Sequence, residues 1–173
     1  MRTASKKPVG LVSAAALGCA ALAGSLVAFP TAAEAQYRQK ISNNLSKCAG
    51  GAGPAVRVTV RGIKSSTGKI RVQSYRGTKA DWLQKGKWIN RIESSARAGT
   101  MTFCVPVPSS GTYGIAVRHD ANGNGKTDIR KDGGAMSNNP SINIFNLGKP
   151  SYKKTAFTVG NAPKSISVNM RYF

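Results

Sequence analysis

The chain has 173 residues, with 26 Lys and Arg against 6 Asp and Glu, and so a formal net charge of +20. This length allows one domain or two very small ones, and a hydrophobic content of 40% is too high for a disordered tail. One His and three Cys leave little material for a zinc site or a histidine-based catalytic centre.

The N-terminal segment has the pattern of a secretory signal peptide. A basic start precedes the apolar stretch 9–29, and small residues at Ala33 and Ala35 precede a candidate cleavage site before Gln36. The pattern predicts export to the periplasm or out of the cell. A membrane anchor that is retained and a lipoprotein modified at Cys19 are the alternatives.

The predicted organisation has three parts. A signal peptide covers 1–35, a polar Gly-rich tail covers 36–53, and a β-sandwich domain covers 54–173. The residues after the signal peptide comprise 23 basic and five acidic ones, which gives a net charge of +18. After the signal peptide, no stretch of the sequence is apolar enough to cross a membrane.

Export would leave two cysteines, Cys48 and Cys104. An even pair in an oxidising compartment predicts one disulfide. Such a bridge would close a loop of about 55 residues and stabilise the fold by roughly 3–4 kcal/mol. Two separate thiols are the alternative, because the spacing alone does not establish that the two Cβ atoms meet.

Apolar and polar residues alternate with period two after the Gly-rich tail. Segments 56–61 and 70–73 flank a turn and predict a hairpin with one buried face. The outer face of this hairpin would bring together Arg57, Arg61 and Arg71.

The rest of the chain continues this pattern of short strands. A single helical turn is predicted over 80–85 and a short strand over 91–96. Further strands are predicted over 100–107, 113–117, 156–159 and 165–172. A parallel α/β sheet would need crossover helices, and no helical stripe of useful length is present. We therefore predict an all-β fold, an antiparallel β-sandwich of about seven strands with an immunoglobulin-like or transthyretin-like Greek key.

The stretch 119–128, with the sequence His-Asp-Ala-Asn-Gly-Asn-Gly-Lys-Thr-Asp, carries a metal-binding pattern. Oxygen-bearing side chains at alternate positions, then a Gly and a later acid, resemble the first nine positions of a calcium loop. The predicted calcium ligands are Asp120, Asn122, Asn124, the backbone of Lys126, and Asp128.

That calcium pattern is incomplete. The twelfth position is Lys131 instead of a bidentate Glu, and Asp132 comes one step late. Any affinity should be weak, about 10⁻⁴–10⁻³ M, as in extracellular modules. The alternative is a polar connection built from two Asn-Gly turns.

Catalytic constellations are scarce. His119 beside Asp120 suggests a general base, but there is no second His, no nucleophile elbow and no carboxylate pair at suitable spacing. We therefore expect no enzymatic activity and no required cofactor, with a hydrolase using His119 and Asp120 as an alternative.

The large positive charge predicts attraction to polyanions. Trp82 and Trp88 bracket two lysines, so this loop could stack on a sugar or bind an anion, although Trp residues more often cap the end of a sandwich. Candidate polyanion-binding residues are Arg57, Arg61, Arg71, Lys85 and Lys87. Export makes nucleic acid an unsuitable partner and favours anionic envelope polymers such as lipopolysaccharide head groups or acidic polysaccharide. The alternative is that the charge only keeps the domain soluble.

Five pieces of the chain occur in an order that resembles a known family. They are 68–75, 111–117, 119–128, Ser137-Asn138-Asn139, and 150–152 with 156–159. From about residue 55 the chain thereby resembles the bacterial family called domain of unknown function 2141. The resemblance implies an exported sandwich protein and supplies no reaction. The chain departs from the family pattern at 129–134 and at Lys153 and Lys154, where family members tend to have acids.

Three functional hypotheses follow. The leading one is a non-enzymatic exported module with a binding or structural role in the cell envelope. The second is a calcium-dependent binder of anionic glycans or lipopolysaccharide, and the third is the hydrolase.

Overall fold

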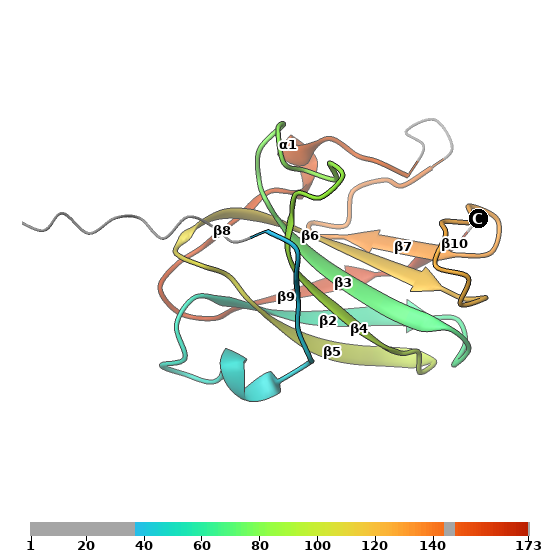
Figure 1. Ribbon diagram of the computed structural model, residues 1–173, viewed down its shortest axis with the longest axis horizontal. Coiled ribbons are helices and arrows are strands. Elements are labelled where there is room, and N and C mark those ends of the chain that lie inside the picture. Colours follow the sequence, from blue (N-terminus) through green and yellow to red (C-terminus); the bar gives the residue numbers. More distant parts are fainter. Residues whose placement is uncertain (1–36, 144–147, 173) are drawn as a thin grey trace, which may run out of the picture. The chain divides into compact units, whose positions relative to one another are not determined.

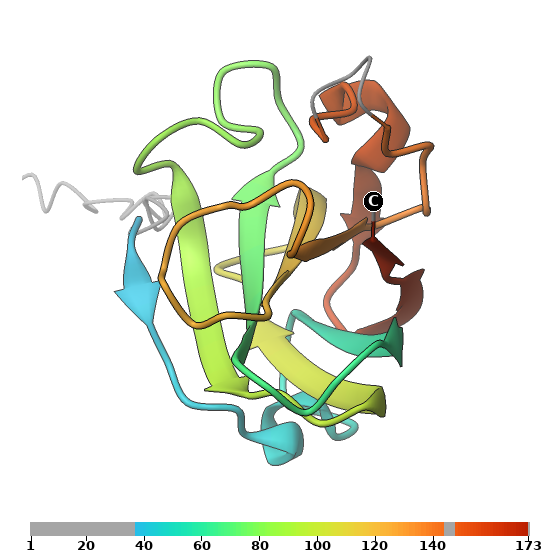
Figure 2. The ribbon, with the colours of Figure 1, turned by 90° about the vertical axis from the view of Figure 1, so that its right-hand side faces the viewer.

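The computed structural model describes residues 37–143 and 148–172. The predicted signal peptide lies outside the described residues. The described chain forms two β-sheets with two short helices, η1 (Leu45–Cys48) and α1 (Tyr152–Thr155). The sheets are shown from two directions in Figures 1 and 2.

Sheet A has seven strands and sheet B has three. The spatial order in sheet A is β1 (Gln39–Lys40), β4 (Trp88–Ser95), β3 (Lys69–Arg76), β6 (Gly111–Asp120), β7 (Gly133–Met136) and β10 (Arg171–Tyr172), and β8 (Phe157–Val159) pairs with β6. The order in sheet B is β5 (Gly99–Pro106), β2 (Ala55–Ile63) and β9 (Lys164–Asn169). Most pairs are antiparallel, but β2 pairs with β9 and β1 with β4 in parallel. The predicted all-β sandwich is confirmed.

The main core lies between the two sheets. Period-two alternation turns Val58 and Val60 of β2 toward Ile70 and Val72 of β3, and all four side chains are fully buried. Burial of side chains of this size stabilises the fold by about 1.5–3 kcal/mol each. The inward faces predicted from sequence alternation are therefore the ones that form the core.

The predicted hairpin between residues 56–61 and 70–73 is wrong. β2 pairs with β5 and β9, whereas β3 pairs with β4 and β6. Arg57 and Arg61 therefore lie on the outer face of sheet B, and Arg71 lies on the outer face of sheet A. Two strands that face each other across a core show the same alternation as two paired strands, so the sequence pattern does not distinguish them.

Short strands are the other elements that sequence alternation missed. The strand β7 is Gly-Gly-Ala-Met and has no alternation to detect, and the predicted strand over 165–172 divides into β9 of sheet B and β10 of sheet A. The tail predicted over 36–53 contributes β1 and η1. Within the described ranges, no helix has the length and apolar character needed to cross a bilayer.

A disulfide joins η1 to the outer face of sheet B. Cys48 at the end of η1 is bonded to Cys104 of β5, with a Cα–Cα distance of 5.7 Å. Arg57 donates a hydrogen bond to the Cys48 carbonyl at 3.3 Å, and Asn43 accepts one from the backbone N–H of Cys104 at 3.0 Å. The predicted disulfide is confirmed, and Arg57 is occupied in holding η1.

Candidate functional site

Arginines from three strands meet on the outer face of sheet A. The register places Arg71 of β3 directly opposite Arg118 of β6, and Arg91 of β4 lies two residue pairs further along, opposite Gln73. We call Arg71, Arg91 and Arg118 the arginine row. Like charges directly opposite on neighbouring strands are unfavourable, so this arrangement costs stability unless counter-charges or a ligand offset it.

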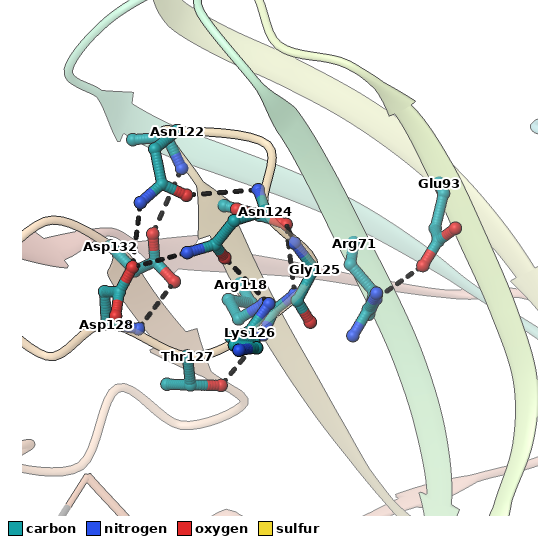
Figure 3. Close-up of polar contacts among 12 residues, drawn as sticks. Arg71, Glu93, Arg118, Asn122, Asn124, Gly125, Lys126, Thr127, Asp128 and Asp132 are labelled. Carbon is teal, nitrogen blue, oxygen red and sulfur yellow. Dashed lines mark hydrogen bonds and ion pairs between the residues drawn. The ribbon is translucent and has the colours of Figure 1, made fainter.

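Few counter-charges accompany the arginine row. Glu93 lies 2.6 Å from Arg71 Nε and 3.9 Å from Arg91 Nη1, so it serves two arginines. Asp120 lies 3.2 Å from Arg118 Nη2. Figure 3 shows Arg71 with Glu93 on one side and Arg118 beneath the adjoining loop. The arginine row therefore keeps an excess of positive charge.

The pKa values of two groups register this electrostatic environment. Burial lowers the pKa of Arg91, and the positive charge of Arg71 lowers it further. Burial alone would raise the pKa of Glu93, but the hydrogen bond from Arg71 and the charges of Arg71 and Arg91 hold it below its ordinary value. A ligand anion near the row would relieve the repulsion between these arginines.

A basic groove adjoins the row at β4 and β1. Its cavity volume is about 660 Å³, and Arg38, Lys40, Lys85 and Arg91 line it together with Tyr75 and Trp88. Among the residues that the structure describes, no acidic side chain lines this groove. The guanidinium of Arg91 lies 4.1 Å from the centre of the Trp88 ring, a cation–π distance. The groove thus combines four cations with an aromatic wall.

Two residues of the basic groove have strained backbones. Arg38 has φ of 67° and Leu83 has φ of 56°, in the left-handed region that large side chains avoid. Each such residue costs roughly 1–2 kcal/mol. Both residues line the groove, and Arg38 is held there by its N–H, which donates to the Trp88 carbonyl at 2.8 Å. Strain of this kind clusters at functional sites, which makes the groove a candidate site.

The predicted Trp–Lys loop divides between packing and this groove. Trp82 is buried, donates to the Pro150 carbonyl at 2.8 Å and packs edge-on against Tyr75 at 5.5 Å. Trp82 is therefore a capping residue and not a stacking surface. Lys85 lines the groove, whereas the ammonium of Lys87 lies 5.0 Å from the ring centre of Tyr37.

Three of the predicted calcium ligands, Asn122, Asn124 and Asp128, hydrogen-bond to one another in the loop after β6 (Figure 3). Asp128 Oδ2 accepts hydrogen bonds from the side-chain amides of Asn122 and Asn124, each at 2.8 Å. These two hydrogen bonds lower the pKa of Asp128. The amide oxygens of the two asparagines accept backbone N–H groups of Asn124 and Lys126.

Two residues that were not among the predicted ligands organise this loop. The buried carboxylate of Asp132 accepts the backbone N–H groups of Ala121 at 3.2 Å and Asp128 at 3.0 Å, and so closes the loop. Arg118 donates to the Gly125 carbonyl at 3.0 Å and to Thr127 Oγ1 at 2.8 Å. The position of Asp132, four residues after Asp128, was the sequence signal for its role.

Asp120 is the loop residue with unused bonding capacity. Its Oδ2 accepts from the N–H of Gly125 at 2.9 Å and from Arg118, but its Oδ1 is buried without a partner. Across residues 37–143 and 148–172, no three or more His, Cys, Asp or Glu side chains are grouped to hold a metal ion. The calcium site stays a prediction.

His119 and Asp120 point to opposite faces of β6, as successive strand residues do. His119 is fully buried on the inner side, with Nδ1 2.7 Å from the Tyr172 hydroxyl and Nε2 2.8 Å from the Thr67 carbonyl. Both ring nitrogens are engaged in the interior. The structure therefore does not form the predicted His119–Asp120 pair.

Comparison with known proteins places the chain in a family. No curated protein and no solved structure matches it. The model of the family described as "uncharacterized protein conserved in bacteria (DUF2141)" matches residues 58–167. This match spans the arginine row and the loop after β6, and it begins after Arg38 and Lys40. The protein belongs to the DUF2141 family.

Proposed function

We propose that the protein is an exported, non-enzymatic module of the bacterial cell envelope that binds anionic polymers on the outer face of sheet A. The observation that carries this proposal is the basic groove, in which Arg38, Lys40, Lys85 and Arg91 line a cavity that has no acid among its described lining residues. Export is supported by the Cys48–Cys104 disulfide, because such bridges persist in oxidising compartments.

The chemistry of the groove suits acidic saccharides such as acidic polysaccharide or lipopolysaccharide head groups. Guanidinium groups form paired hydrogen bonds with carboxylate and phosphate. Tyr75 and Trp88 supply an aromatic wall beside these cations, and aromatic rings can pack against the apolar side of a sugar. The net charge of the chain adds a long-range attraction that salt would screen over about 10 Å at 0.1 M.

The test compares two triple variants with the same change in net charge. The groove variant carries Arg38→Gln, Lys85→Gln and Arg91→Gln. Affinity for soluble polygalacturonate is measured by calorimetry, with neutral dextran as the reference polymer. Loss of three charge-assisted contacts at about 1.5 kcal/mol each should reduce the affinity of the groove variant about a thousandfold.

The control variant removes three exposed cations that are not among the residues lining the basic groove: Arg61→Gln, Arg97→Gln and Lys154→Gln. We expect this variant to lose less than about threefold in affinity, because long-range attraction is screened. Equal losses in the two triple variants would show that net charge alone drives binding and would overturn the proposed groove.

A second candidate is that calcium strengthens this anion binding through the loop after β6. The observation that favours it is the buried, unpartnered Oδ1 of Asp120, which a cation would satisfy. Calcium at about 1–5 mM should then raise the melting temperature of the wild type and leave Asp120→Asn unchanged. Identical melting curves with calcium and with a chelator would remove this candidate.

A further inference from the structure

A second cavity lies on the outer face of sheet A and is mainly apolar. Its volume is about 260 Å³, and Leu83, Ala116, Ile129, Met136 and Ile142 supply its apolar wall. Ile129 is 48% exposed, which is unusual for a large apolar side chain in this structure. A mainly apolar cavity with a few polar groups at its edge is the usual form of a small-molecule site.

Positive charge borders this apolar cavity. Arg71, Arg118 and Lys149 contribute to its lining, and Asp132 is the acid among the lining residues. Both carboxylate oxygens of Asp132 accept backbone N–H groups, so this acid is committed to the loop. The polar edge of the cavity is therefore suited to an anionic group.

The apolar cavity and the basic groove are neighbours with a shared wall. Gln73 and Leu83 line both of them, one from β3 and the other from the loop before β4. Leu83 is one of the two strained residues, and its left-handed backbone places its side chain at this shared wall. A single ligand can therefore contact the cations of the groove and the apolar wall of the cavity together.

We infer that this face binds a monomeric amphiphilic anion, with a phosphate or carboxylate head and one aliphatic chain. The inference rests on the proposed anion binding and deepens it. The head lies among the cations of the basic groove and the arginine row, and the chain enters the apolar cavity between Leu83, Ala116 and Met136. Charge complementarity selects the head, and removal of the aliphatic chain from water drives its burial.

The size of the cavity sets the length of chain that it accepts. The cavity is bounded, with a volume of about 260 Å³, so it can remove only a limited number of methylenes from water. Each buried methylene should improve affinity about fourfold. Affinity should therefore rise with chain length and level off once the chain fills the cavity.

The first experiment titrates the full mature protein with butyl, hexyl, octyl and decyl phosphate below their micellar concentrations. Inorganic phosphate is the probe without a chain. Emission of Trp82 and Trp88 reports binding, because both residues belong to the apolar cluster that includes Met136 and adjoins the cavity. The inference predicts tighter binding from butyl to octyl phosphate, whereas equal affinities for all five probes would overturn it.

The second experiment fills the cavity. Ala116→Leu adds a side chain at the apolar wall, and Thr59→Leu makes a comparable addition on the outer face of sheet B. We expect Ala116→Leu to abolish the dependence on chain length, and Thr59→Leu to retain it. If Ala116→Leu fails to fold by circular dichroism, Met136→Ala serves instead, because the enlarged cavity should shift the plateau to longer chains.

The outcomes separate this inference from the proposed function. Binding of polygalacturonate without any effect of alkyl chain length would leave the proposed function standing and overturn the amphiphile. Chain-length dependence that persists in Ala116→Leu would overturn the assignment of this cavity. Failure of both polygalacturonate and alkyl phosphates to bind would overturn both proposals.

Discussion

The two faces of sheet A differ in whether their polar groups have hydrogen-bond partners. On the inner face, His119 has a partner for each ring nitrogen, and the Ser137 hydroxyl donates to the Thr155 carbonyl at 2.6 Å. On the outer face, arginines lie opposite one another. The outer face also carries Arg118 Nε and Asp120 Oδ1, which are buried without partners in the described part of the chain.

This difference indicates where stability and binding are located. A polar group buried without a partner costs about 1–3 kcal/mol, and the inner face avoids that cost. The outer face retains it, together with the strained backbones of Arg38 and Leu83. Unfavourable features that the fold does not need are expected where a ligand relieves them. Changes on the inner side or on sheet B should therefore lower stability, and changes on the outer face of sheet A should lower binding.

Removal of the disulfide should have the largest effect on stability. The bridge spans 56 positions, and a loop of that length contributes about 4 kcal/mol in the chain-entropy model. The double variant Cys48→Ser and Cys104→Ser should lose about that much free energy of unfolding in urea. Its affinity for polygalacturonate should be unchanged under conditions where it is folded, because the bridge lies on sheet B. A large loss of affinity in the folded variant would contradict the separation of the two roles.

Substitution of His119 should have the next largest effect. His119→Phe removes the ring-nitrogen partners of the Thr67 carbonyl and of the Tyr172 hydroxyl, which keeps only the N–H of Lys64. This loss should cost about 2–3 kcal/mol of unfolding free energy. Tyr172→Phe removes one hydroxyl and should cost less. Urea unfolding measures both losses of free energy. A loss below about 0.5 kcal/mol for His119→Phe, as is typical of a substitution at an exposed position, would refute its interior role.

Substitution in the arginine row should lower the affinity for anions and leave the stability of the fold nearly unchanged. Arg71→Gln removes one of two opposed arginines, so the free energy of unfolding should change by less than about 0.5 kcal/mol or increase. Affinity for polygalacturonate should fall about tenfold, the equivalent of one charge-assisted contact. Arg61→Gln on sheet B is the matched control. Strong destabilisation by Arg71→Gln would show that the row serves folding.

The smallest expected effect is a pH dependence from Glu93. Its pKa is lowered from the ordinary value of 4.5, so Glu93 is charged near neutrality and becomes protonated only as the pH falls below that value. Protonation frees Arg71 and Arg91 for a ligand. Binding of dextran sulfate, which stays charged in acid, should therefore strengthen below pH 4.5 and be independent of Glu93 above it.

Protonation of Glu93 should also change the stability of the fold. A carboxylate whose pKa is lowered by folding contributes stability above its unfolded pKa and loses it as the pH falls through the folded value. The Glu93 side chain is 31% exposed, so this contribution should be below about 1 kcal/mol. Glu93→Gln should remove the acid strengthening of binding. An identical pH profile in wild type and Glu93→Gln would exclude Glu93 as its source.

The sequence was sufficient for features that depend on local pattern. Alternation identified the core valines. The even number of cysteines after the predicted signal peptide predicted the Cys48–Cys104 disulfide, and the Asn-Gly sequence predicted a polar loop after the strand that ends at Asp120. The basic groove could not be predicted, because Arg38, Lys85 and Arg91 come from three separate segments. Their meeting depends on strand register and on the parallel pairing of β1 with β4, which no local pattern encodes. For the same reason the sequence grouped Arg71 with Arg57 and Arg61, whereas the structure places it beside Arg118.

The pairing of β2 with β9 has a consequence for how the chain matures. One of the first strands to emerge during synthesis finds its neighbour within residues 164–169, near the end of the chain. Pairings this distant in sequence form late, because a large loop must close first. One edge of β2 must therefore stay unpaired until nearly the whole polypeptide is made. An unpaired strand edge can pair with another chain, so we expect the unfinished polypeptide to aggregate unless a chaperone protects that edge.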